Sequence, residues 1–115
     1  MLTFKYGSNN MDADMRLTHP SLKILRFFQD SAATAEISGS DITKGTGLLS
    51  GTVYPVLLRF ESLGLLTSRW EDVDPSAVKR PRRRFYRLTG EGARVARTAL
   101  RELESAPGIL LPEGA

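Results

Sequence analysis

The chain has 115 residues, of which 41% are hydrophobic and 25% charged, and a net charge of +3; this fits one folded domain with a modest core and argues against wholesale disorder. The absence of cysteine excludes disulfides, thiol nucleophiles and thiolate metal sites. No apolar run approaches the roughly 20 residues that span a bilayer, and no apolar signal segment opens the chain, so we expect a cytoplasmic protein with no membrane partner.

Residues 1–17 are polar and contain glycine and asparagine, which favours a flexible N-terminal arm or a short appended element. Thr18 is predicted to cap the first helix, because a proline follows in the first turn, where its missing N–H has no partner. An apolar face at helical spacing then runs to about Asp30. It comprises Leu22, Ile24, Leu25, Phe27 and Phe28. We expect this helix to pack into a core, with Phe60 among its neighbours.

Two further helices are predicted, separated by a turn that contains two glycines. Residues 36–38 are either one short strand or an extended entry to the first of them. Ser40 is expected to cap that short helix, which runs to about Thr46. Ser50 is expected to cap the third helix, which Gly64 ends. The apolar face of the third helix comprises Val53, Val56, Leu57, Phe60 and Leu63.

The hydrophobic period changes toward two in residues 65–71 and again in residues 83–88, which predicts two strands of a hairpin joined by a charged loop. Thr89 is expected to cap a last helix over residues 90–105, followed by a tail, residues 106–115. The order of elements predicts a mainly α fold with a small β-hairpin, the winged form of helix-turn-helix. Residues 18–89 would form the DNA-binding domain, with a three-helix core and a wing.

Positive charge is concentrated in one window of the chain. Nine basic residues and one acid lie between Lys79 and Arg101, so this window carries +8 and the rest of the chain −5. An isolated charge run is commonly a solubilising loop, but this one lies between two predicted strands, which favours a surface that faces a polyanion. Duplex DNA is the partner we expect, with phosphates or a narrow minor groove as the target. The residues concerned are Arg80, Arg82, Arg83 and Arg84.

Two motifs resemble those of PadR-like transcriptional regulators. Residues 50–66, SGTVYPVLLRFESLGLL, are similar to the family's recognition helix, which opens with Gly-Thr, an aliphatic residue and Tyr-Pro and closes with Leu-x-x-Leu-Glu-x-x-Gly-Leu. Residues 80–92, RPRRRFYRLTGEG, resemble its wing and the start of its last helix. The resemblance covers residues 18–104 and implies a homodimeric repressor that binds an inverted repeat. Phe60 replaces the usual leucine, and one helix replaces a longer C-terminal domain, so a small-molecule effector is left open.

The start of the third helix is expected to enter the major groove. Ser50, Gly51 and Thr52 are small enough for a close approach to the duplex, and the hydroxyls of Ser50 and Thr52 can bond a phosphate or a base edge. Tyr54 either donates to a phosphate or packs on the second helix, and Lys44 is expected to contact a phosphate. No Arg, Asn or Gln stands at this end of the helix for bidentate base readout.

The last helix has a basic stripe and a small apolar stripe. The basic stripe is interpreted as a solvated face, or as one paired with nearby acids or a second subunit. The apolar stripe is expected to form the seam of a homodimer, because a short chain offers little else to cover it. It comprises Ala96, Ala99, Leu100 and Leu103. The aromatic residues of the hairpin, Trp70, Phe85 and Tyr86, are expected in the core.

Nothing in the sequence indicates catalysis. His19 is the single histidine, no cysteine accompanies it, and no glycine-rich phosphate loop is present. We therefore expect no enzyme, no catalytic residue, no metal site and no cofactor. The alternative to a DNA-binding regulator is a winged-helix adaptor that docks a protein or RNA partner. Steep salt dependence and a preferred palindrome would favour the regulator.

Overall fold

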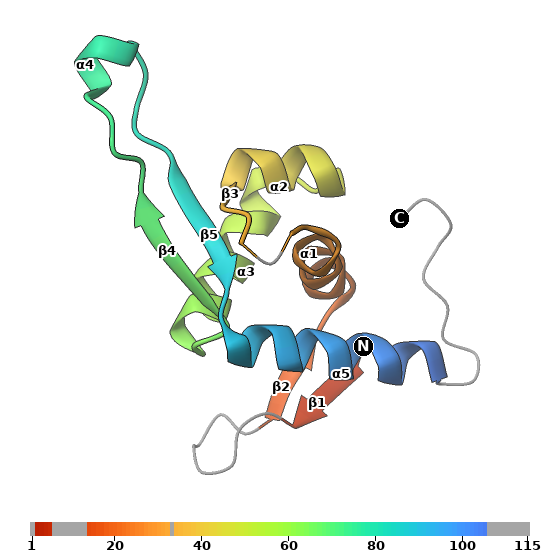
Figure 1. Cartoon of the computed structure of the whole chain (residues 1–115). Helices are drawn as coiled ribbons and strands as arrows, with labels where there is room; N and C mark the ends of the chain where they lie inside the picture. The colour runs from red at the N-terminus through yellow and green to blue at the C-terminus, as the bar shows by residue number, and fades with distance from the viewer. Residues whose placement is uncertain (1, 6–13, 33, 106–115) are drawn as a thin grey trace.

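A computed structural model describes residues 2–5, 14–32 and 34–105 of the chain. It is a helical body from which a β-hairpin projects (Figure 1). The helices are α1 (His19–Asp30), α2 (Gly39–Thr46), α3 (Ser50–Ser62), α4 (Pro75–Val78) and α5 (Gly90–Ser105). The strands are β1 (Leu2–Lys5), β2 (Asp14–Leu17), β3 (Ile37–Ser38), β4 (Leu66–Trp70) and β5 (Arg84–Leu88). This order confirms the predicted mainly α fold with a hairpin wing.

The first and last long helices begin where the sequence predicts. The Thr18 hydroxyl accepts a hydrogen bond from the Ser21 N–H at 3.3 Å and so caps α1. The Thr89 hydroxyl accepts one from the Gly92 N–H at 3.0 Å at the start of α5. Each bond satisfies an amide that has no partner inside its helix. The cap at Thr18 marks the start of α1, and the cap at Thr89 marks the point where the chain leaves the wing and enters α5.

The predicted N-caps of the next two helices were wrong: the cap of α2 lies two residues before the predicted one, and the cap of α3 lies one residue before it. Ser38, not Ser40, caps α2: its hydroxyl accepts from the Asp41 N–H at 3.1 Å, and the Asp41 carboxylate accepts from the Ser38 N–H at 3.1 Å. This reciprocal pair satisfies two amides, whereas a cap at Ser40 satisfies one. The N-cap of α3 is Leu49, which makes no side-chain cap bond. Ser50 is the first residue of α3, and its side chain is exposed.

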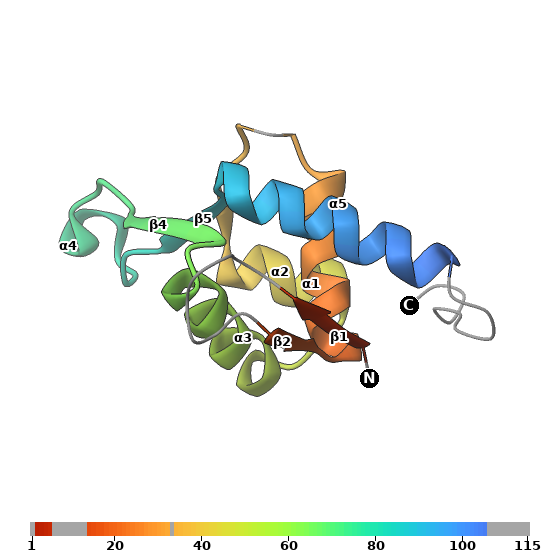
Figure 2. The ribbon, with the colours of Figure 1, turned by 90° about the horizontal axis from the view of Figure 1, so that it is seen from below.

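The core lies where α1, α2, α3 and α5 meet the sheet. Its fully buried residues include Ile24, Leu25, Ile42, Val53, Leu57, Phe60 and Val95. Phe28 and Phe60 are core residues, and Phe27 packs against them, as predicted. Figure 2 shows the wing leaving this body on one side, with α4 at its tip, while α5 runs toward the other side.

The apolar stripe of α5 is part of this core, which contradicts its predicted role as a dimer seam. Ala96 and Ala99 have no exposed surface, and Leu100 and Leu103 are each 4% exposed. The stripe is buried because α5 packs against α1 and joins the same cluster. The premise that the chain has too little to cover these residues was wrong. A second copy has no access to them in this structure.

The wing is a three-stranded antiparallel sheet with the order β3-β5-β4. Leu66 pairs with Leu88, Ser68 with Tyr86 and Trp70 with Arg84, so the two alternating runs form one antiparallel ladder, as predicted for a hairpin. The short strand predicted near residue 37 is confirmed as β3, which pairs with β5. The loop between β4 and β5 contains α4, which the sequence analysis missed. Its signal was Asp74 followed by Pro75, an N-cap and a proline in the first turn.

The first 17 residues contribute two strands, β1 and β2, in an antiparallel ladder that runs from Leu2 opposite Leu17 to Lys5 opposite Asp14. The described part therefore matches the short appended element rather than the flexible arm. The missed signal was the alternation of apolar and polar residues in both segments, LTFK and DMRL. Residues 1 and 6–13 of the predicted arm, and the predicted tail, residues 106–115, lie outside the described residues.

Candidate nucleic-acid interface

The third helix presents one face to solvent. Its opposite face, with Val53, Leu57 and Phe60, is buried. Ser50 and Gly51 are exposed and Thr52 is half-buried, so the residues predicted to meet the major groove are at the surface. No Cβ built on Gly51 meets another atom within 4 Å, which leaves the start of the helix open to a close approach.

Tyr54 is both packed and exposed. A Cβ built on Gly39, the first residue of α2, would lie 2.4 Å from the Tyr54 hydroxyl oxygen, so the ring rests on the start of α2. The side chain is nevertheless 46% exposed. Packing on α2, one of the two roles predicted for Tyr54, therefore leaves the side chain accessible for the other, donation to a phosphate. Lys44 is exposed in the last turn of α2.

An ion pair between Glu71 and Arg80 closes the loop of the wing beyond strands β4 and β5. The guanidinium donates through Nη1 to Oε1 at 2.7 Å and through Nη2 to Oε2 at 3.0 Å. The Glu71 carboxylate also accepts from the backbone N–H of Arg83 at 3.1 Å, and the Glu71 N–H donates to the Arg83 carbonyl at 2.7 Å. The hydrogen bonds from Arg80 lower the pKa of Glu71 to about 2. Arg80 therefore holds the wing together.

The partner of Arg80 is Glu71 and not an aspartate of the same loop. The Asp74 carboxylate is occupied at the tip of the wing, where it accepts the Ser76 N–H at 3.0 Å and caps α4. The bond between Glu71 and Arg80 joins residues nine apart along the chain, on the two sides of the hairpin. The sequence carries no local signal for such a pair, because closure of the hairpin brings the partners together.

Arg84 and Trp70 form a second contact on the wing. The Arg84 guanidinium carbon lies 4.8 Å from the centroid of the Trp70 ring, and its Nη2 lies 3.6 Å from a carboxylate oxygen of Glu61 on α3. Trp70 is 57% exposed, so its predicted place in the core was wrong. Trp70 ends β4 at the end of the ladder away from the body, and its ring lies against a cation instead of a core. Tyr86 is buried and Phe85 half-buried.

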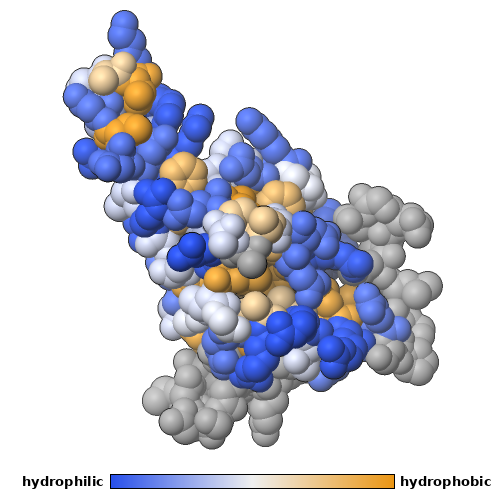
Figure 3. All heavy atoms as spheres, viewed as in Figure 1, coloured by the Kyte–Doolittle hydropathy of each residue, from blue (hydrophilic) through white to orange (hydrophobic). Residues whose placement is uncertain are grey.

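The two remaining wing arginines are exposed. Arg82 donates through Nε to the carbonyl oxygen of Val73 at 2.9 Å. The Arg83 side chain has neither a hydrogen bond nor an ion pair with any described residue. Figure 3 shows the wing as a projection covered mostly by hydrophilic residues. Of the four arginines predicted to face DNA, these two are the most accessible.

A groove of about 530 Å³ lies between the wing and the helical body. It is lined by Ser40 from α2, Tyr54 from α3, and Trp70, Arg82 and Arg84 from the wing. The fold thus brings a residue of the third helix together with the wing arginines, although they are far apart in the sequence. Burial raises the pKa of the phenol of Tyr86, another residue of this groove, so its hydroxyl stays protonated. Lys44 and residues 50–52 lie outside the groove.

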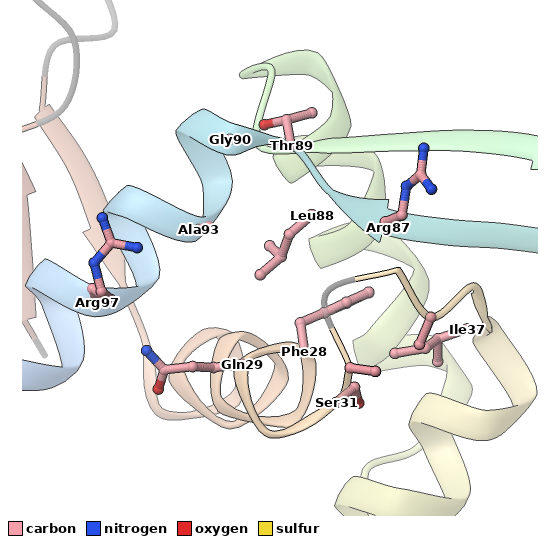
Figure 4. A pocket seen from close by; sticks show the side chains of 12 residues that line it. Phe28, Gln29, Ser31, Ile37, Arg87, Leu88, Thr89, Gly90, Ala93 and Arg97 are labelled. Carbon is pink, nitrogen blue, oxygen red and sulfur yellow. The ribbon is translucent and has the colours of Figure 1, made fainter.

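A second cavity, of about 460 Å³, lies between the end of α1, the end of β5 and the start of α5. Figure 4 shows Phe28 and Leu88 pointing toward each other inside it, while the guanidinium groups of Arg87 and Arg97 extend away from the cavity. It shares no residue with the wing groove. Among the described residues, no group of three or more potential metal ligands is found. No described helix is long and apolar enough to cross a membrane.

Comparison with known proteins agrees with this geometry. The model of the Transcriptional regulator PadR-like family matches residues 37–98. A PadR family transcription regulator from Clostridium difficile is similar at 25% identity and a TM-score of 0.61, over 76% of this chain and 88% of that one. A second, from Eggerthella lenta, is 26% identical with a TM-score of 0.59, over 73% of this chain and 70% of that one.

Bacillus subtilis PadR in complex with operator DNA has the same fold, with 20% identity and a TM-score of 0.60 over 82% of this chain and 53% of that one. A search of curated proteins found no match. The family model covers more than half of the chain, and the recognition-helix and wing motifs lie within it. The chain therefore belongs to the PadR-like family of transcriptional regulators, which confirms the resemblance seen in the sequence and the prediction that it is not an enzyme.

Proposed function

We propose that the protein binds duplex DNA as a homodimer on an inverted repeat and represses transcription by occupying the promoter. The observation that carries the proposal is the groove that Tyr54 of α3 shares with Arg82 and Arg84 of the wing. A helix start that can enter the major groove and cations that can bind the flanking phosphates thus lie on one side of the molecule. The structure of a similar protein, Bacillus subtilis PadR, with operator DNA supports this reading.

Each candidate residue has a distinct part in this proposal. Arg82 and Arg83 are exposed and bind phosphates or a narrow minor groove. Ser50 and Thr52 bond a phosphate or a base edge at the start of α3, and Gly51 allows the backbone to approach. Lys44 binds a phosphate beside them.

Tyr54, Arg80 and Arg84 combine contact with positioning. The Tyr54 hydroxyl lies at the start of α2 and can donate to a phosphate from there. Arg84 contacts both Trp70 and Glu61 and so ties the wing to α3. Because Arg80 is bound at both terminal nitrogens by Glu71, we assign it to the shape of the wing ahead of any contact with DNA.

The homodimer is proposed from the two-fold symmetry of an inverted repeat, and its interface is not the buried stripe of α5. The outer face of α5 is the accessible part of that helix. Arg97, Glu102 and Glu104 are exposed there, and Arg94 pairs with Glu91 at 2.5 Å. A mixed-charge face of this kind can pair with a two-fold copy of itself. This face replaces the apolar stripe as the proposed seam.

Selection of bound sequences from random duplexes tests the proposal. We expect an enriched inverted repeat whose half-site centres lie about 10 base pairs apart, or a multiple of that. Binding to it should weaken steeply with salt, because phosphate contacts release counterions. Absence of any enriched duplex, together with salt-insensitive capture of a protein or RNA, would instead support the adaptor.

A further inference from the structure

The outward stripe of α3 lacks charge. It consists of residues at helical spacing along one face, Gly51, Pro55, Leu58 and Ser62, all of which are exposed. Only one of them, Leu58, has a side chain long enough to extend well beyond the backbone. A recognition helix with this stripe has no guanidinium or amide to place on a guanine or an adenine.

The two charged residues of α3 are engaged by the protein itself. Arg59 donates through Nη2 to the buried hydroxyl of Ser21 on α1 at 3.1 Å. Glu61 accepts the hydroxyl of Ser68 on β4 and lies 3.6 Å from Arg84. Arg59 is exposed beside the outward stripe with its guanidinium bound to α1, and Glu61 is half-buried against the wing. The outward stripe is left with apolar and hydroxyl groups.

Leu58 is 70% exposed in the middle of this stripe. It lies seven residues after Gly51, so it shares the face that the open start of α3 presents. A leucine in a helix leans toward the N-terminal end, which carries this side chain back over the turn of Tyr54 and Pro55. An exposed leucine alone is ordinary, but this one lies one helical turn after Tyr54, which lines the groove together with the wing arginines.

We propose that α3 recognises its operator through thymine methyl groups, and that Leu58 is the residue that contacts them. The inference rests on the proposed binding of duplex DNA. The C5-methyl of thymine is the apolar group that the major groove displays, and it is the feature an apolar side chain can select. The arginines of the wing supply attraction to any sequence, since phosphates are the same everywhere. The half-sites should accordingly contain thymines at fixed positions facing α3.

Replacement of thymine by uracil tests this directly, because uracil pairs identically and lacks only the methyl group. Each thymine of the selected repeat is replaced in turn, and the affinity of the wild type and of Leu58→Ala is measured for every duplex. We expect uracil at one or two positions per half-site to weaken the wild type about three- to ten-fold, the scale of one lost apolar contact. Leu58→Ala should show the same loss on the thymine duplex and no further loss with uracil at those positions.

The matched control is Val78→Ala, which removes an exposed apolar side chain from α4 at the tip of the wing. It should keep the uracil sensitivity of the wild type. Circular dichroism should show Leu58→Ala folded, because the side chain is outside the core. Tight binding of the wild type with no sensitivity to uracil, or equal uracil losses in the wild type and Leu58→Ala, would overturn the inference alone. No preferred duplex for the wild type would overturn the proposed function along with it.

Discussion

Glu71 and Arg80 form a two-point ion pair, with N···O distances of 2.7 and 3.0 Å, where the loop that carries α4 continues beyond strands β4 and β5. The same carboxylate also accepts the backbone N–H of Arg83. One acidic side chain thus holds both an arginine and the strand that follows it. These bonds hold the backbone beside the wing arginines in one conformation, which lowers the conformational entropy lost when the arginines bind a polyanion.

The contribution of Glu71 to stability should depend on pH. Its pKa is lowered from 4.5 to about 2 in the folded protein. A lowered acid pKa stabilises the fold fully above the unfolded value, and this stabilisation is lost as pH falls from about 4.5 toward 2. We expect the difference in Tm between the wild type and Glu71→Gln to be constant above pH 5 and to shrink below it. Parallel Tm profiles down to pH 2 would contradict the pairing.

Arg82 and Arg83 should contribute affinity without specificity. Replacing both by alanine should weaken binding to every duplex and reduce the slope of log K against log salt by about one unit for each lost phosphate contact. The matched control is Arg26→Ala, which removes an exposed arginine from α1, outside the wing. Titrations of operator and scrambled duplex at several salt concentrations measure both effects. An unchanged slope in the double variant would remove the wing from the interface.

Leu103→Asp should destabilise the fold. The side chain is 4% exposed in the core, and an aspartate there would be buried without a partner, at a cost of about 2–5 kcal/mol. Thermal unfolding followed by circular dichroism should show a markedly lower Tm, with Leu58→Asp, the same change at an exposed leucine, as the control. If Leu103→Asp kept the wild-type Tm and only shifted sedimentation toward a monomer, the stripe would be a seam after all.

Thr52→Val should separate specific from non-specific binding. The change keeps the shape of the side chain and removes its hydroxyl at the start of α3, so the fold should survive. Binding to the operator should weaken by about 1–3 kcal/mol if the hydroxyl bonds a base edge or a buried phosphate. Binding to a scrambled duplex, which depends on the wing, should change little. Equal losses on both duplexes would make Thr52 a positioning residue only.

The sequence predicted the elements whose determinants are local. Thr18 and Thr89 cap their helices because the hydroxyl and the amide it satisfies are three residues apart. The two strands of the wing followed from alternation, whereas their register, with Ser68 opposite Tyr86, was not predicted. The cap of α2 was misplaced because Ser38 and Ser40 both suit an N-cap. The choice depends on the reciprocal bond with Asp41.

The features that the sequence did not predict depend on tertiary packing. The small apolar stripe of α5, including Ala96, looks the same whether α1 or a second subunit covers it. The exposure of Trp70 follows from the distance the wing projects, which alternation does not fix. The spacing of Leu58 from Gly51 could have placed both residues on one face of α3. The sequence could not show that Arg59 and Glu61, the charged residues of this helix, bind neighbouring elements.

Binding to an inverted repeat and to the same duplex with one half-site scrambled tests the central claim most directly. For a homodimer that places one α3 in each half-site, we expect two chains per intact duplex. Scrambling one half-site should weaken binding by at least ten-fold at constant salt, because half of the base contacts are lost while the phosphates remain. One chain per duplex, with equal affinity for the intact and half-scrambled sites, would contradict the claim.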